Sequence, residues 1–387
     1  MHVPENTPPI VVAEVAHAPI TNAAAAAQFA ESDSPIGQLA HLRNIKWHGH
    51  SEELIAACDQ FIKRNMDSES GAGHRAVAEA FRMKIEMLKE IGSLEDELRA
   101  CNAFLLAFGR GTDSSLDAQI CRTMLDQGRV FGQMDRAGHA AAVYDALIQR
   151  FAKSDDPAVR SDVIAALTRQ AAIAAQHGRI GEEVRCYQRL VSKFGEVSAT
   201  DVQREVARAM LNTGLAFRKL DRKLDELAVY DAIQHRFGNS EDAEILYVLA
   251  RAMVRKSITL GERGRRQEQI KVCDAIIVRF ANAESQFLRR QAARTQCNRA
   301  MALEELGQIP DAMAAYEQII ASFDRAVDSP LRACAGLALF QKAQLLRRQR
   351  RRAEAIACYQ HFIQSYPMDD EEISGLISQS QALLRVL

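Results

Sequence analysis

The sequence predicts an all-α protein built from repeated antiparallel helix pairs, a right-handed α-solenoid, and three observations support this prediction. The first is composition, because 48% of the 387 residues are hydrophobic and only 6% are aromatic, a usage that favours helices throughout. The second is an internal period of 43 residues that runs without insertion. The third is a turn residue at a constant place in each period.

One column of this period carries the clearest signal. The positions three, four and seven residues after it are almost all apolar, and apolar residues at these spacings define one buried face of an α-helix. We therefore expect a helix, called helix B here, in each of eight periods. The column reads Cys58, Cys101, Tyr144, Tyr187, Tyr230, Cys273, Tyr316 and Tyr359.

A turn residue lies nine positions before the column. Most of these residues are glycine or aspartate, which tolerate the left-handed backbone conformation that a tight turn between two helices requires. The turn therefore separates helix B from a preceding helix A. The turn positions are Gly49, Gly92, Asp135, Gly178, Asp221, Gly264, Gly307 and Arg350.

Helix A is defined by its start and by its small residues. Pro157 after Asp156 and Pro330 after Ser329 have the pattern of a proline behind an N-cap residue, which begins a helix A of about 20 residues. Small residues recur 16 positions before the column, so we expect helix A to lie very close to a neighbouring helix. They are Gly128, Ala171, Gly214, Ser257, Ala300 and Ala343.

The order of small residue, turn glycine, alanine and aromatic residue, as in Ala300, Gly307, Ala312 and Tyr316, resembles the tetratricopeptide repeat (TPR). The family repeat has about 34 residues, and the additional nine lie here between helix B and the next helix A. The resemblance covers residues 34–387. It implies stacked helix pairs with a concave face that binds peptides.

The motif departs from the family in one respect. The alanine expected four residues before the column is present as Ala140, Ala312 and Ala355. Glutamate occupies the same position in three other periods, at Glu97, Glu183 and Glu226.

Two regions are expected along the chain. Residues 1–33 contain four prolines and an alanine run and lack the repeat, which predicts a flexible N-terminal tail. Residues 34–387 are expected to form a TPR-like solenoid of about eight repeats, in which residues 371–387 supply a last helix A that caps the array.

Composition excludes some classes of protein. Lys and Arg number 49 and Asp and Glu number 50, so we do not expect a globally basic nucleic-acid binder. No stretch approaches the roughly 18 apolar residues of a membrane-spanning helix. The N-terminus lacks a basic signal, so we expect a cytoplasmic protein.

Neither catalysis nor a cofactor is expected. The sequence has no GxxxxGK[ST], GxSxG or HExxH motif, which weakens the NTPase, hydrolase and metalloprotease interpretations. The eight cysteines form no CxxC pair, which predicts reduced, buried thiols. His41, His48 and His50 are the nearest approach to a metal site, but their spacing places at most two on one surface, so no metal is expected.

The strongest binding signal is a ladder of arginines at equivalent points of successive A helices. The ladder contains Arg208, Arg251 and Arg294, and an asparagine or arginine lies four residues after each of them. By resemblance to TPR proteins these side chains would line the concave groove, while the alternative is a solvated helix face that pairs with acids such as Glu205. The candidate partner-binding residues are Arg122, Arg208, Asn212, Arg251, Arg255, Arg294 and Asn298.

Basic residues also gather at several turns between helices A and B. They could form a ridge that attracts a phosphate backbone or an acidic protein surface, although no aromatic residues for base stacking interleave with them. The ridge consists of Arg218, Lys219, Arg222, Lys223, Arg263, Arg265, Arg266, Lys342, Arg347, Arg348, Arg350, Arg351 and Arg352.

From these features we predict a non-catalytic scaffold or adaptor that binds a peptide or helix of a partner in the concave groove, with a preference for acidic ligands. An RNA-binding helical repeat that uses the ridge is the first alternative. A small-molecule sensor or an enzyme with a pocket inside the superhelix is the second.

Overall fold

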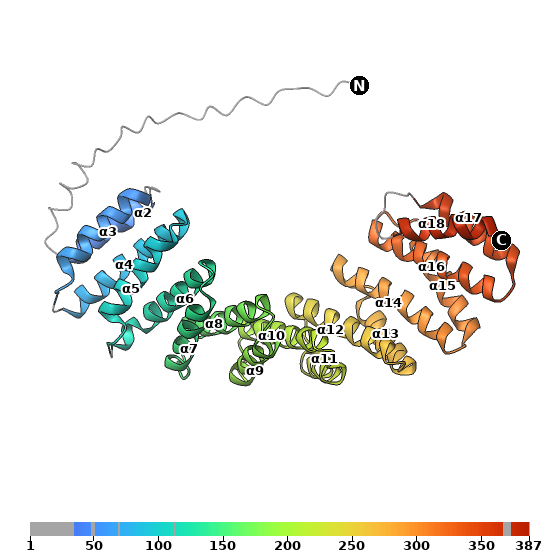
Figure 1. The fold of residues 1–387 in the computed structure, drawn as a ribbon, viewed down its shortest axis with the longest axis horizontal. Coiled ribbons are helices and arrows are strands. Elements are labelled where there is room, and N and C mark those ends of the chain that lie inside the picture. Colours follow the sequence, from blue (N-terminus) through green and yellow to red (C-terminus); the bar gives the residue numbers. More distant parts are fainter. Residues whose placement is uncertain (1–34, 48–50, 69, 112, 367–372, 387) are drawn as a thin grey trace, which may run out of the picture. The chain divides into compact units, whose positions relative to one another are not determined.

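The computed structural model describes residues 35–47, 51–68, 70–111, 113–366 and 373–386, drawn in colour in Figure 1. Within these ranges all regular secondary structure is helical, with 17 α-helices, one short 3-10 helix and no strand. The all-α prediction is confirmed. The predicted tail, residues 1–33, lies outside the described residues, as do His48, Gly49 and His50.

A helices and B helices alternate along the chain. Each B helix begins 43 residues after the one before it, and so does each A helix from α8 to α16. The A helices are α2 (Pro35–Trp47), α4 (Gly71–Ile91), α6 (Asp117–Gln133), α8 (Pro157–Gln176), α10 (Thr200–Lys219), α12 (Ala243–Glu262), α14 (Gln286–Glu305), α16 (Ser329–Arg348) and α18 (Ser374–Val386). The B helices are α3 (Ser51–Asn65), α5 (Leu94–Phe108), α7 (Ala137–Arg150), α9 (Ile180–Phe194), α11 (Lys223–Phe237), α13 (Arg266–Phe280), α15 (Ile309–Phe323) and α17 (Arg352–Ser365). The 3-10 helix is η1 (Ser114–Leu116).

The chain divides into two compact units between Val163 and Ile164, inside α8, and each unit is described by itself. In the first unit α3 packs on α2 and α4, and α6 packs on α5 and α7. In the second unit each A helix packs on its own B helix and on the next A helix, as α12 does on α13 and α14. The last helix, α18, packs on α16 and α17. Both units are therefore stacks of helix pairs in chain order, as expected for a solenoid.

The predicted left-handed turn is confirmed at all seven turn positions within the described residues. Their φ angles lie between 54° at Asp221 and 79° at Gly92. At Asp221 the turn is closed by two hydrogen bonds, from the Arg222 amide to the Phe217 carbonyl at 2.9 Å and from the Asp221 amide to the Arg218 carbonyl at 3.0 Å. These bonds satisfy carbonyls at the end of α10 and let α11 begin immediately.

The small residues of helix A lie directly under the tyrosines of helix B. A Cβ atom added to Gly214 would lie 2.5 Å from Cε1 of Tyr230, and one added to Gly128 would collide with the ring of Tyr144. Both tyrosines are buried. The neighbour predicted for the small column is therefore the helix B of the same pair.

At the first two cysteines of the column the facing position on helix A is large, whereas the third, Cys273, faces the small Ser257. Cys58 and Cys101 are preceded 16 residues earlier by Leu42 and Ile85, and all four side chains are fully buried. In these two pairs a large residue on helix A thus accompanies a small one on helix B. The total side-chain volume between the two helices is roughly conserved, as close packing requires.

The predicted helix starts are confirmed with one shift. Asp156 caps α8 by accepting the Ala158 amide at 2.7 Å, and Pro157 is the first residue of that helix. For α16 the N-cap is Asp328 instead of Ser329, so this helix starts one residue earlier than predicted. The Asp328 carboxylate makes no capping hydrogen bond of its own and pairs instead with Arg290 of α14.

The three glutamates that replace the motif alanine are buried, and each is paired with a basic side chain. A buried carboxylate requires such a partner, because leaving water without one is very costly. The pairs connect α5 to α6, α9 to α10, and α11 to α10. They are Glu97 with Arg129, Glu183 with Lys219 at 3.2 Å, and Glu226 with Arg218 at 3.5 Å.

Seven of the eight cysteines are buried, as predicted, and their reduced state stays a prediction. None of the helices in the described ranges combines the length and the apolar character that crossing a bilayer demands.

Replacing Gly214 with alanine is expected to lower the free energy of unfolding by about 1–3 kcal/mol, because the new methyl group would overlap the Tyr230 ring. Gly181 in α9 provides a matched control, since a Cβ there meets only the flexible guanidinium of Arg185 at 3.8 Å. Urea denaturation of both variants measures the difference. Equal stability of the two variants would contradict the close contact.

Replacing Arg129 with methionine is expected to cost about 3–5 kcal/mol, because it leaves the fully buried Glu97 carboxylate without a base. The Glu97→Ala variant should lose less stability, since Arg129 is 15% exposed and its guanidinium can reach water. Denaturation curves of the two variants test this order, and the reverse order would show that the carboxylate does not depend on Arg129.

Candidate functional site

A cavity of about 610 Å³ lies in the second unit, between the A helices α12, α14 and α16 and the start of α18. We call it the arginine cavity. Among the described residues, three arginines and no acidic residue line it. Its lining residues are Arg251, Val254, Arg255, Ile258, Phe287, Gln291, Arg294, Cys297, Asn298, Ala333, Cys334, Leu337, Ile373 and Leu376.

Four of the seven predicted partner-binding residues line the arginine cavity. Arg251 and Arg255 come from successive turns of α12, and Arg294 and Asn298 come from the equivalent turns of α14. Their positions follow from the 43-residue period, which places equivalent side chains of two adjacent A helices next to one another. The remaining three predicted residues, on α6 and α10, do not line this cavity.

Apolar side chains form the rest of the wall. Leu337 from α16 and Ile373 and Leu376 from the start of the last helix face the same space as the arginines. Ile373 is only 2% exposed and belongs to a core cluster with Phe340. The cavity therefore offers both cationic groups and apolar surface, which suits a ligand that has an anionic part next to an apolar part.

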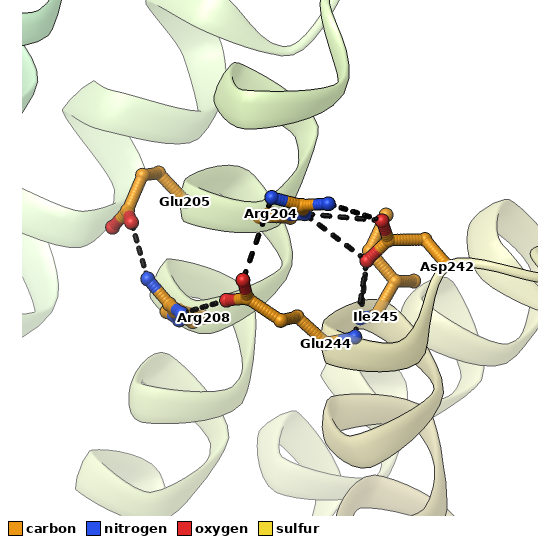
Figure 2. Close-up of polar contacts among 6 residues, drawn as sticks. All are labelled: Arg204, Glu205, Arg208, Asp242, Glu244 and Ile245. Carbon is orange, nitrogen blue, oxygen red and sulfur yellow. Dashed lines mark hydrogen bonds and ion pairs between the residues drawn. The ribbon is translucent and has the colours of Figure 1, made fainter.

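Arg208, the first ladder member in the second unit, is neutralised by its own chain. Its guanidinium pairs with Glu205 on α10 and with Glu244 on α12 (Figure 2). Arg204, one turn earlier, pairs with Asp242 at 2.7 Å and with Glu244 at 3.4 Å. At Arg208 the ladder is therefore part of a helix face whose charges are paired within the chain, which was the alternative to ligand contact in the sequence analysis.

Two other predicted residues also have partners within the chain. Arg122 pairs with Asp162 at 2.8 Å in the first unit, where burial raises the pKa of the Asp162 carboxyl above its ordinary value although the Arg122 charge opposes this. Asn212 hydrogen-bonds to the side chain of Tyr187. Both residues therefore hold neighbouring helices together.

The acids that neutralise Arg208 are absent one repeat later. Val248 stands in the place of Glu205, and Phe287 stands in the place of Glu244. The Arg251 guanidinium instead lies over the Tyr247 ring, 5.5 Å from its centroid, and Tyr247 lies against Phe287 with the ring centroids 4.4 Å apart. Within the described ranges, no carboxylate pairs with Arg251 or Arg255.

The helices around the cavity are fixed at their starts by arginine–aspartate pairs. Asp242 caps α12 by accepting the amides of Glu244 and Ile245 at 3.1 Å, and it also accepts hydrogen bonds from Arg204 (Figure 2). Asp328 is the N-cap of α16 and pairs with Arg290 of α14 at 2.6 Å.

These hydrogen bonds have an electrostatic consequence. Bonding to Arg204 lowers the pKa of Asp242, and bonding to Arg290 lowers the pKa of Asp328, in both cases against a smaller opposing effect of burial. The two aspartates therefore stay ionised in the folded chain and complement the positive ends of α12 and α16.

The basic ridge is largely compensated by carboxylates. Only part of its charge is therefore available to a phosphate backbone, which weakens the RNA-binding interpretation. The paired ridge residues are Arg218 and Lys223 with Glu262, Lys219 with Glu183, Arg222 with Asp225, Arg265 with Glu268, Arg266 with Glu305, Lys342 with Glu317, Arg348 with Glu304, and Arg351 with Glu354.

No group of three or more potential metal ligands lies together among the residues that the structure describes. Of the three histidines considered from the sequence, only His41 falls in this part of the chain.

Sequence reasoning missed the apolar wall and the cysteine pair of the cavity. The columns considered in the sequence did not include Leu337, Ile373 or Leu376, which come together where α18 packs on α16. Cys334 could have been found by comparing columns, since it occupies the place of Glu205 and Val248 in the earlier repeats.

Two segments, residues 298–325 and 337–367, match the tetratricopeptide repeat family. No curated protein sequence matches the chain. The first segment spans the end of α14 and all of α15, and the second spans most of α16 and all of α17. The matching part is therefore the C-terminal portion of the second unit.

Several solved structures are similar to the chain. A tetratricopeptide repeat protein from Parabacteroides merdae is 14% identical over 79% of this chain and 98% of its own, with a TM-score of 0.37. The apo form of the quorum sensor NprR from B. thuringiensis is 10% identical over 91% of this chain and 97% of its own, with a TM-score of 0.39. A Rap protein complexed with competence and sporulation factor is 12% identical over 91% of this chain and 96% of its own, with a TM-score of 0.34.

Exchanging both Arg204 and Arg290 for glutamine is expected to lower stability at neutral pH. The two aspartates have folded-state pKa values below those of the unfolded chain, so their contribution is present above about pH 3.9 and is lost as the pH falls through the folded-state values. Urea denaturation from neutral to strongly acidic pH should show the difference from wild type shrinking in acid. A difference independent of pH would contradict the ionic origin of these pairs.

Proposed function

Because the chain is built from stacked helix pairs and two of its segments match the tetratricopeptide repeat family, we propose that it is a non-catalytic interaction protein that holds a segment of a partner in the arginine cavity. The segment is a peptide or a helix that presents an acidic residue next to an apolar side chain. The A helices α12, α14 and α16 supply the surface on which it lies.

One observation carries this proposal: among the residues that the structure describes, no acid lines the cavity that Arg251 and Arg255 face. One repeat earlier, the same ladder position is neutralised by Glu205 and Glu244. A ligand carboxylate at the arginine cavity would play the part that these glutamates play at Arg208. Charge complementarity of this kind determines partner choice and orientation.

The apolar wall supports the second half of the proposal. Leu337, Ile373 and Leu376 provide a recess for an aliphatic or aromatic side chain, and Phe287 and Tyr247 form an aromatic pair beside Arg251. Tyr247 is 42% exposed. Large, partly exposed aromatic residues next to arginine are typical of the centres of protein interfaces.

Selection from a random peptide display library tests this function. We expect wild-type protein to enrich peptides with Asp or Glu within a few residues of an aliphatic or aromatic side chain. The Arg251→Gln, Arg255→Gln double variant should bind an enriched peptide about ten- to a hundredfold more weakly, because hydrogen bonds to a charged group contribute about 1.5–3 kcal/mol. Fluorescence anisotropy with the labelled peptide measures this loss.

Arg208→Gln is the matched control, since Arg208 holds an equivalent ladder position but is already paired within the chain. It should leave peptide affinity unchanged. Enrichment without acidic residues, or an equal loss in both variants, would argue against the cavity. Titration of a labelled RNA oligonucleotide at low salt distinguishes the other candidate, because tight, salt-sensitive binding there would favour the ridge.

A further inference from the structure

Two cysteines from adjacent A helices meet in the wall of the arginine cavity. Cys297 lies on α14 and Cys334 on α16, and both line the cavity. Their sequence separation of 37 residues conceals this contact, which arises because α14 and α16 pack directly on one another.

The contacts place the two sulfur atoms together. The Cys297 thiol donates to the backbone carbonyl of Cys334 at 3.5 Å, and the Cys334 thiol donates to the carbonyl of Pro330 at 3.3 Å. The two thiols are also close enough to hydrogen-bond to each other. Two cysteines in such contact on neighbouring packed helices are candidates for a disulfide, which requires Cα atoms within about 7 Å of each other.

The pair differs from the other cysteines of the chain in its surroundings. Cys273, for comparison, is fully buried in the helix B column, next to Ser257. Cys297 and Cys334 are only 1% and 5% exposed, but both line a cavity of about 610 Å³. Each is therefore buried by protein on all sides except the one that faces the cavity. A small molecule in the cavity would lie directly against them.

The charge of the cavity favours one class of reagent. Among the residues that the structure describes, Arg251, Arg255 and Arg294 line it and no acidic residue does, a lining that favours anions over cations. Hydrogen bonding to Cys334 and burial raise the pKa of Cys297, and the Arg294 charge acts in the opposite direction. The Arg294 charge, one helical turn before Cys297, only partly offsets this rise, so Cys297 rests as the thiol and must lose its proton before disulfide exchange.

We propose that Cys297 and Cys334 form a redox-active dithiol that a small, negatively charged disulfide oxidises from within the arginine cavity. This inference goes beyond the proposed function and does not depend on it, because it concerns the cavity wall and not the partner. The product is a disulfide that joins α14 to α16.

The reaction balances as two successive exchanges. The thiolate of one cysteine attacks a sulfur of the small disulfide, which forms a mixed disulfide and releases one small thiolate. The thiolate of the second cysteine then attacks the protein sulfur of the mixed disulfide and releases the other small thiolate. The protein loses two electrons and two protons, and the small disulfide becomes two small thiols.

The test uses the full chain and two aliphatic disulfides of opposite charge, oxidised glutathione and cystamine. Each rate is divided by the rate of the same reagent with a small free thiol, which removes intrinsic reactivity. We expect the normalised rate with oxidised glutathione to exceed that with cystamine at least tenfold at low salt, and the ratio to fall as salt is added. Mass spectrometry of the digested, non-reduced chain should show Cys297 linked to Cys334 with no retained glutathione.

Variants separate the pair from the other thiols. Cys297→Ser should leave a glutathione adduct on Cys334, while Cys273→Ser should leave both the rate and the linked product unchanged. The Arg251→Gln, Arg255→Gln variant should lose most of the preference for the anionic reagent. The melting temperature of the oxidised chain should rise, because the bond closes a loop of the unfolded chain.

Two results would overturn the proposal. One is a wild-type chain that keeps glutathione on a single cysteine without forming the link. The other is an equal normalised rate for the two reagents. The peptide-binding experiment is unaffected by either result, so failure of this inference is distinguishable from failure of the proposed function.

Discussion

The contact between a large residue of helix B and a small residue of helix A is the constraint on which the rest of the structure depends. At Tyr230 and Gly214 the ring lies so close to the backbone of α10 that no Cβ fits between them. The left-handed turn at Asp221 brings the two helices together over only a few residues. Because the two helices of each pair pack in the same way, residues 43 positions apart occupy equivalent points on successive A helices. Their side chains therefore lie next to one another in a line along the stacked helices.

This regularity lets one repeat act as a reference for the next. At the α10–α12 step the ladder arginine has two glutamates, and the pairing is complete within the chain (Figure 2). At the α12–α14 step the same positions hold Val248 and Phe287, so the arginine is retained while its acids are lost. Paired charges at one step hold helices together, whereas the same charge at the next step faces a cavity.

The cavity combines features that rarely occur together on a solvated helix face. Its cationic side chains come from α12 and α14, its apolar wall comes from α16 and α18, and its thiols come from α14 and α16. The pairs of Arg204 with Asp242 and Arg290 with Asp328 hold the N-terminal ends of α12 and α16. The lining residues are therefore carried by helices whose ends are fixed, which reduces the entropy that a ligand must overcome on binding.

Much of the candidate site was accessible to sequence reasoning because a strict period converts spacing into geometry. The period identified Arg251, Arg255, Arg294 and Asn298 as neighbours, and these residues do line one cavity. The same reasoning treated Arg208 as their equal. It could not decide between ligand contact and internal pairing, because that choice depends on acids such as Glu244, which lies 36 residues away on another helix.

The sequence by itself determined the helical class, the division into A and B helices, the left-handed turns and the small residues at which helix A lies close to a neighbouring helix. These features depend on local backbone preferences and on a repeated pattern of side-chain size, which are written directly in the order of residues. Only the tertiary structure decided which charges are neutralised, where α18 closes a cavity, and that Cys297 touches Cys334. Such contacts depend on distances between helices far apart in the chain, and those distances are set by packing and not by the local sequence.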